Sequence, residues 1–359
     1  MPTRSIDLGQ VESIAQDYYL PVIRDQYFLS NALYYSLKQK GRVRHYNGGR
    51  AIFQPLSFAP EGGGGQWWSG VDKMDTRIRN PITGATFYRK NYSVPIIITR
   101  DEEDSVGKDG HKIIDLVDAK MNIAKPTAVD AVGTELYNDG SDARKIGGLL
   151  HICALQSDLT TAATQLTYGG ITTSAIGTTT SNAWWQPQQW TTASQTGASS
   201  SFAGARGFGP VGVLWSKIRK ASGKSPTMIV SNTGAYQDFH DSLTGVGIGS
   251  GPMAGGQRFM PQDLNLAKAG FENLMYKTAA WVLDERAPQT SGNVGCCFML
   301  NEDTLNLVIH EKRDMSLDGW YNPYDQRVRL AYIDWSGEIV CSERRANGVI
   351  GAINVAATA

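Results

Sequence analysis

The sequence has few cysteines, no excess of charge and no long hydrophobic run, and each absence excludes a class of protein. Its 359 residues include 4 cysteines, too few for the disulfide framework of a small secreted domain. None of them stands in a C-x-x-C arrangement, so the spacing of a zinc site is missing. Cys296 and Cys297 are adjacent in an apolar strand pattern, which favours buried, reduced thiols.

Charge and hydropathy exclude two kinds of partner. Lys and Arg number 34, as do Asp and Glu, so no long-range field holds nucleic acid or an anionic membrane tightly. A dedicated DNA- or RNA-binding protein is therefore not expected. The longest aliphatic run, residues 94–98, is too short to span a bilayer, and the N-terminus lacks the pattern of a signal peptide. We expect a soluble product made in the cytoplasm, with no membrane partner.

The sequence offers no convincing catalytic or metal-binding motif. The histidines form no H-x-x-x-H or H-E-x-x-H arrangement; they are His45, His111, His151, His240 and His310. Ser231, Asp238 and His240 include the residue types of a hydrolase triad, but no G-x-S-x-G elbow presents the serine. The acidic run at residues 101–104 lacks the ligand spacing of a calcium loop. We expect no enzyme activity, no cofactor and no metal ion.

Residues 49–99 predict a long β-hairpin. An outgoing strand is expected over 51–59, followed by a glycine-rich tip and a return strand over 85–99. One face of the return strand carries the even-numbered side chains Tyr88, Tyr92, Val94, Ile96 and Ile98. Pro55 and Pro95 each remove a backbone donor, which favours edge strands. Because a two-stranded ribbon is at best marginally stable alone, this hairpin is expected to rest on a neighbouring molecule.

The tip places a glycine run beside two large rings. Glycine lets the backbone conform to a partner, and indole rings supply contact area; packing of the rings onto their own hairpin is the alternative. A phosphate loop is not expected, because the Lys-Ser/Thr pair is missing. The candidate assembly residues are Gly62, Gly63, Gly64, Gly65, Trp67, Trp68, Tyr88 and Tyr92.

The rest of the chain mixes helical and strand patterns. One apolar stripe predicts a helix of about seven turns; its residues are Ile113, Val117, Met121, Ala124, Ala128, Val132 and Leu136. Pro126 predicts a kink or two collinear helices, and Gly140 is a candidate terminator. A loop-rich stretch over 157–201 precedes an α/β unit: a helix over 211–221, a strand over 226–231, and a helix over 233–243 before a glycine-rich loop at 245–256. Further strands are expected over 274–283, 295–299 and 305–309, then a closing hairpin of 328–333 and 338–343.

This order of parts resembles the major capsid proteins of tailed double-stranded-DNA bacteriophages. The most specific stretch is IITRDEE at 97–103, KIIDLVDAKM at 112–121, ELYNDG at 135–140 and IGGL at 146–149. It is similar to the passage from the extended loop into the spine helix of that family. A second match is Gly169-Gly170-Ile171 followed by Trp184-Trp185.

The resemblance implies an α+β fold of the tailed-phage and herpesvirus type. It implies an N-terminal arm at 1–48, an extended loop at 49–99 and the spine helix of a peripheral domain at 100–149. Residues 150–270 would form mainly the axial domain, and strands at 271–359 would return to the peripheral domain. Because the chain begins at the arm, any scaffold is expected to be a separate protein.

The implied function is self-assembly through pentamers and hexamers into an icosahedral shell around the viral genome. Implied partners are further copies of the chain, a portal protein, a scaffolding protein, cement proteins and weakly held packaged DNA. The implied location is the virion, after assembly in the host cytoplasm. Two other interpretations stay open: a tail or baseplate component, and a carbohydrate-binding module that uses Trp184, Trp185 and Trp190 as stacking platforms.

Overall fold

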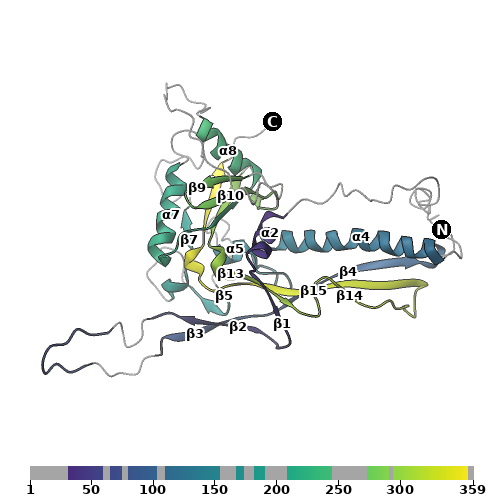
Figure 1. Ribbon diagram of the computed structural model, residues 1–359, viewed down its shortest axis with the longest axis horizontal. Helices are drawn as coiled ribbons and strands as arrows, with labels where there is room; N and C mark the ends of the chain where they lie inside the picture. The colour runs from purple at the N-terminus through teal and green to yellow at the C-terminus, as the bar shows by residue number, and fades with distance from the viewer. Residues whose placement is uncertain are drawn as a thin grey trace. The chain divides into compact units, whose positions relative to one another are not determined.

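The computed structural model describes residues 31–59, 65–74, 80–102, 110–153, 167–173, 182–190, 208–244, 273–290 and 294–354. These residues divide into two compact units (Figure 1). The spine unit comprises described residues within 91–132 and 310–336, and the sheet unit comprises those within 31–90, 133–309 and 337–354. Each unit is described by itself.

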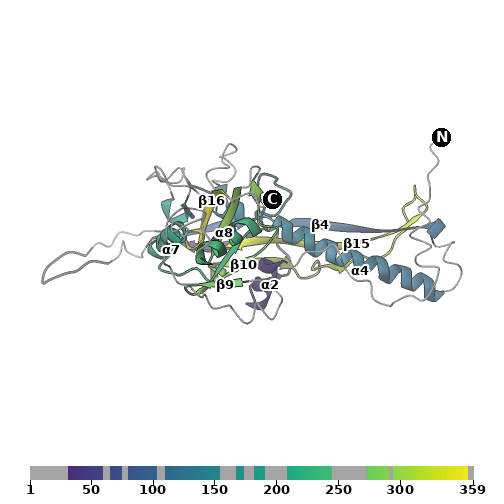
Figure 2. The same cartoon turned by 90° about the horizontal axis from the view of Figure 1, so that it is seen from above.

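The spine unit packs one long helix on a small sheet. Helix α4 (Gly110–Glu135) lies along strands β4 (Lys90–Thr99) and β15 (Val328–Cys341) (Figures 1 and 2). Strand β15 pairs with β4 and with β14 (Ser316–Leu317), where Ser316 opposes Asp334. The core consists of Ile96, Ala124, Ala128, Ala331 and Ile333, flanked by Val94, Met121 and Met315. The predicted even-numbered inner face of β4 is therefore confirmed for Val94, Ile96 and Ile98.

Helix α4 runs unbroken through Pro126 and ends at Glu135. Of the two outcomes predicted for Pro126, the division into two collinear helices is wrong, and the kink stays a prediction. The proline removes only one donor from a helix that buries Ala124 and Ala128 on either side of it. The apolar stripe is confirmed from Ala124 to Leu136, whereas the side chains of Ile113 and Val117 lie outside the described residues. Gly140 does not end the helix; it lies five residues later with φ +75°.

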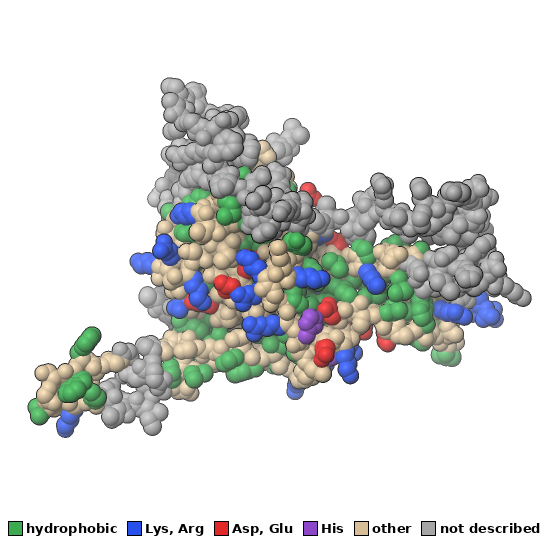
Figure 3. Space-filling view, in the orientation of Figure 1, with side chains coloured by type: hydrophobic (Ala, Val, Ile, Leu, Met, Phe, Trp, Pro, Cys, Tyr) green, Lys and Arg blue, Asp and Glu red, His purple; other side chains and the backbone are tan. Residues whose placement is uncertain are grey.

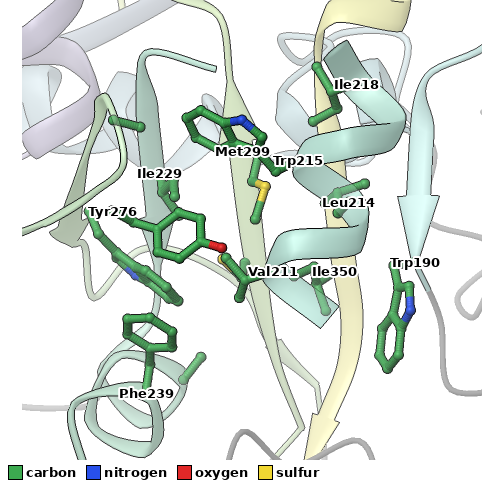
Figure 4. Packing of buried hydrophobic residues seen from close by; sticks show 14 of the residues in the cluster. Trp190, Val211, Leu214, Trp215, Ile218, Ile229, Phe239, Tyr276, Met299 and Ile350 are labelled. Carbon is green, nitrogen blue, oxygen red and sulfur yellow. The ribbon is translucent and has the colours of Figure 1, made fainter. Parts of the chain in front are cut away.

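The sheet unit contains a seven-stranded mixed sheet in the order β7-β16-β12-β8-β10-β9, with β11 beside β12. Their bounds are β7 Gln188–Trp190, β16 Gly348–Asn354, β12 Val294–Leu300, β8 Met228–Ser231, β10 Ala279–Leu283, β9 Asn273–Tyr276 and β11 Gln289–Thr290. Helices α7 (Phe208–Ser222) and α8 (Thr233–Thr244) contribute to one core cluster with Ile229, Trp281 and Met299. Figure 4 shows this packing. The predicted α/β unit is confirmed.

Two strand predictions are wrong. Residues 274–283 form two strands that reverse at Lys277, which has φ +54°. The closing hairpin is a single strand, β15, because the supposed turn is interior: Trp335 and Ser336 are buried. Gly337 opposes Ile309 of β13 (Leu305–His310). The turn-like composition of residues 334–337 is overridden by this pairing.

Residues 31–46, within the expected arm, belong to the sheet unit. Asn31 caps α2 (Ala32–Gln39), which buries Leu33 and Leu37, and β1 (Val43–Tyr46) pairs with β13. Buried Glu302 accepts hydrogen bonds from Ser36, Lys40 and Thr227. Residues 1–30 of the expected arm lie outside the described residues. The remaining short elements are α5 Leu149–Cys153, β5 Thr167–Tyr168, β6 Ile171–Thr172, η3 Ala183–Trp185, η5 Glu302–Thr304 and η6 Arg344–Ala346.

Candidate assembly surface

A two-stranded hairpin projects its outer face to solvent. Strand β2 (Ile52–Ser57) pairs with β3 (Ile82–Phe87), with Ile52 opposite Phe87 and Ser57 opposite Ile82. Among the described residues no third strand joins this sheet. Pro55 and Pro95 both lie in edge strands, as predicted, since β4 pairs with β15 alone.

The return strand is shorter than predicted. It comprises β3, and residues 90–99 form the separate strand β4. The buried residues are odd-numbered in β3, Ala85 and Phe87, but even-numbered in β4, Ile96 and Ile98. Residues 88–89 between the strands absorb this change of face.

The inner face anchors the base of the hairpin. Leu56, Ala85 and Phe87 are buried, and the Phe87 ring lies 5.0 Å from that of Tyr168. The Thr86 amide donates to the Gly169 carbonyl at 2.9 Å. Gly169 has φ +63°, and a Cβ there would lie 2.7 Å from the Ala85 Cβ, so glycine permits this close approach. The predicted hairpin therefore has a fixed base.

The outer face leaves large apolar side chains exposed. Phe53 is 65% exposed and Ile82 62% exposed. The Phe53 ring covers Gly84, where an added Cβ would lie 2.0 Å from the ring, and such a contact shields an otherwise bare glycine. Phe58, also exposed, lies 5.6 Å from the Trp184 ring. These residues were missed by sequence reasoning, although Phe53 follows the alternation of the outgoing strand.

The tip presents the two predicted tryptophans. The Ser69 amide donates to Asp72 Oδ2 at 3.0 Å, and Gln66 Nε2 donates to the Lys73 carbonyl at 3.3 Å. Trp67 and Val71 are completely exposed (100%), and Trp68 and Met74 are also exposed. The alternative that the indoles pack onto their own hairpin is thus wrong for Trp67. Figure 3 shows green side chains gathered on this segment at the lower left.

The structure brings only some of the eight predicted assembly residues together. Gly65, Trp67 and Trp68 share the tip. Gly62, Gly63 and Gly64 lie outside the described residues. Tyr88 is exposed just beyond β3, whereas Tyr92 is exposed on β4 in the other unit.

A pocket of about 440 Å³ lies beside the base of the hairpin. Residues 55–59 line it together with Trp184, Trp185, Ser342, Glu343 and Arg345. Burial acts to raise the pKa of Glu343, but hydrogen bonds from Lys224 and Arg345 lower it overall. Of the three tryptophans in the carbohydrate-binding interpretation, Trp185 and Trp190 are buried in the core and offer no face for stacking, whereas Trp184 is half-buried and lines this pocket.

The described residues offer little for catalysis. They contain no group of three or more His, Cys, Asp and Glu side chains that could hold a metal ion. Ser231 is completely buried, and its Oγ accepts a 2.7 Å hydrogen bond from Trp281 Nε1. A helix long and apolar enough to cross a membrane is likewise not found in the part of the chain that the structure describes.

Comparison with solved structures identifies the fold. The chain is similar to the capsid protein of cyanophage A-1(L), with 16% identity, a TM-score of 0.62, and coverage of 96% of this chain and 99% of that one. The capsid protein of the native GTA particle is 13% identical, with a TM-score of 0.57 over 98% of this chain and 99% of that one.

The SrpI encapsulin of Synechococcus elongatus PCC 7942 is 10% identical, with a TM-score of 0.56 over 96% and 95% of the two chains. No family model and no curated protein match the sequence. The chain has the fold that these capsid and encapsulin proteins share, which confirms the α+β fold implied by the sequence.

Proposed function

We propose that this chain is the major capsid protein of a tailed double-stranded-DNA bacteriophage. Copies assemble through pentamers and hexamers into an icosahedral shell that encloses the genome. The role is mechanical and not enzymatic, and its place is the virion, after assembly in the host cytoplasm. The observation that carries the proposal is the β2–β3 hairpin, a two-stranded sheet with an exposed apolar outer face and two exposed indoles at its tip.

The hairpin supports assembly because its contacts are incomplete within one chain. Soluble monomers rarely expose contiguous apolar patches, and a two-stranded ribbon alone is marginally stable. A contact between the tip of one copy and a different surface of the next is heterologous, and heterologous contacts close into rings when the rotation permits. Summed over many copies, such interfaces offset the entropy that each subunit loses on association.

The same fold also occurs in an encapsulin, so a second kind of shell is an alternative function. The encapsulin match spans nearly the whole chain, so an encapsulin-type complex that holds no viral genome is the alternative. The contents of the shell distinguish the two functions, because a phage shell requires a portal and packaged DNA. A separate scaffolding protein and cement proteins would accompany its assembly. A tail or baseplate component would form tubes or plates instead.

Negative-stain microscopy of the purified, concentrated protein tests the proposal. Closed shells are expected from the natural chain, alone or with its scaffold. The double variant Trp67→Ser/Trp68→Ser should give soluble subunits with a strongly reduced shell yield. Trp320→Ser, at an exposed aromatic position outside the hairpin, is the control and should assemble normally. Tubes would favour a tail component, and permanent monomers with scaffold supplied would contradict the proposal.

A further inference from the structure

The positive charges of the neutral chain are segregated. Residues 159–237 contain five Lys and Arg and no Asp or Glu. Four of these cations lie on α7 or directly after it: Lys217, Arg219, Lys220 and Lys224. A local concentration of one sign creates a field at the surface even when the net charge is zero.

Helix α7 directs these cations outward. Its apolar residues Val211, Leu214, Trp215 and Ile218 are buried in the core of the sheet unit. Lys217, Arg219 and Lys220 are exposed outside this buried stripe, and Lys217 Nζ also donates to the Gln189 carbonyl at 3.2 Å. Figure 3 shows blue side chains along the edge of the sheet unit where Figure 1 places α7.

Neighbouring elements extend the charge. Lys277, in the turn between β9 and β10, places its Nζ 5.2 Å from the centre of the Trp215 ring. Beyond the end of α7, Lys224 Nζ lies 2.8 Å from Glu343 Oε2, and Arg345 Nε lies 2.8 Å from the other oxygen of the same carboxylate. Glu343 is thus shared between two cations, so this group stays positive overall. We call Lys217, Arg219, Lys220 and Lys224 the α7 basic face.

We propose that the α7 basic face contacts the phosphate backbone of the enclosed double-stranded DNA. The partner rests on the proposed function, since a shell around a genome brings this chain close to DNA. The face is polar: among the α7 side chains that the structure describes, Val213 is the one large apolar residue that is exposed. Protein interfaces have an apolar, charge-depleted core, whereas nucleic-acid interfaces are polar and strongly positive, which favours DNA over an acidic protein. The contact is weak and independent of sequence, because phosphates carry no base information.

Fluorescence anisotropy with a labelled 30-base-pair duplex tests the surface on the full chain. The variant Lys217→Gln/Arg219→Gln/Lys220→Gln removes three charges and leaves the pairs of Glu343 intact. The control Lys38→Gln/Arg44→Gln/Arg50→Gln removes three exposed charges elsewhere in the sheet unit. For the α7 variant, the slope of log affinity against log salt should fall in magnitude by about 2 to 3, and affinity at low salt by about tenfold or more. The control should retain the slope of the natural chain.

Three results separate the possibilities. Equal slopes for the α7 variant and the control would overturn the inference. If the α7 variant no longer binds polyglutamate but still binds DNA, the inference is overturned in favour of an acidic protein partner. If the α7 variant forms shells at normal yield but binds DNA more weakly, the result supports the inference, because assembly and DNA contact are then separable. If the natural chain forms no shells, the proposed function fails, and the anisotropy slopes still decide whether α7 binds DNA.

Discussion

The backbone amide of Gly147 donates a 2.9 Å hydrogen bond to Glu338 Oε1 in the interior of the sheet unit. The Ile339 amide donates to the same oxygen at 3.2 Å. Burial raises the pKa of Glu338 from its ordinary 4.5 to about 7, although these two amides and the charge of Lys90 act to lower it. The carboxyl therefore binds its proton more tightly in the folded chain than in the unfolded chain.

This linkage predicts a loss of stability as the pH rises. Above pH 4.5 the unfolded carboxyl ionises while the folded one stays protonated up to about pH 7, so Glu338 destabilises the fold progressively across that window by a total of about 3 kcal/mol. Glu338→Gln keeps an oxygen that accepts from Gly147 and cannot ionise. Urea unfolding of both proteins at pH 4.5, 6 and 8 measures the difference.

The variant should gain stability relative to the natural chain between pH 4.5 and 8. A constant difference across this range would show that Glu338 titrates at its ordinary pKa.

Gly148 is predicted to tolerate no side chain. A Cβ there would lie 2.3 Å from the backbone nitrogen of Asn138 and 2.5 Å from the carbonyl oxygen of Leu136, and neither can move away like a flexible side chain. Gly148→Ala should cost about 3 kcal/mol or more of unfolding free energy, measured by chemical denaturation. At Gly319 an added Cβ meets nothing within 4 Å, so Gly319→Ala is the control. Equal stability of the two variants would contradict the packing described here.

Arg344 is predicted to be irreplaceable even by lysine. It is completely buried, donates from Nε to the Ile152 carbonyl at 2.8 Å and from Nη2 to the His151 carbonyl at 2.9 Å, and lies over the Tyr168 ring. A lysine cannot reproduce the planar fork, so Arg344→Lys should lose about 2 kcal/mol through one missing bond. Arg345→Lys, on the half-buried neighbour that pairs with Glu343, keeps the positive charge and should change stability by less than about 0.5 kcal/mol. Similar thermal unfolding of both variants would show that the fork contributes little.

The sequence predicted those helices and strands whose position depends on the spacing of nearby apolar residues. The apolar stripe placed α4, and the run of apolar residues before Ser231 placed β8 between two helices. The two indoles at the tip were recognised because large rings beside glycines have few uses in a core.

The remaining features depend on contacts distant in sequence. The Ser-Gly turn signal at residues 334–337 was overridden because Gly337 pairs with Ile309 and Trp335 is buried. The change of inner face between Phe87 and Ile96 depends on β3 and β4 having different partners. Phe53 was missed because no pattern shows that its ring covers Gly84 on a sheet without a third strand.

Thiol labelling at the hairpin tip tests the central claim most directly. Cys153, Cys296, Cys297 and Cys341 are all buried, so Ser69→Cys introduces a distinctive reactive thiol next to Trp68 with little change in volume. If neighbouring copies cover the tip, this thiol should react rapidly with a maleimide in free subunits and at least about tenfold more slowly in assembled particles, because an interface core excludes water and reagent. Equal labelling rates in subunits and particles would show that the tip stays uncovered and would contradict the account.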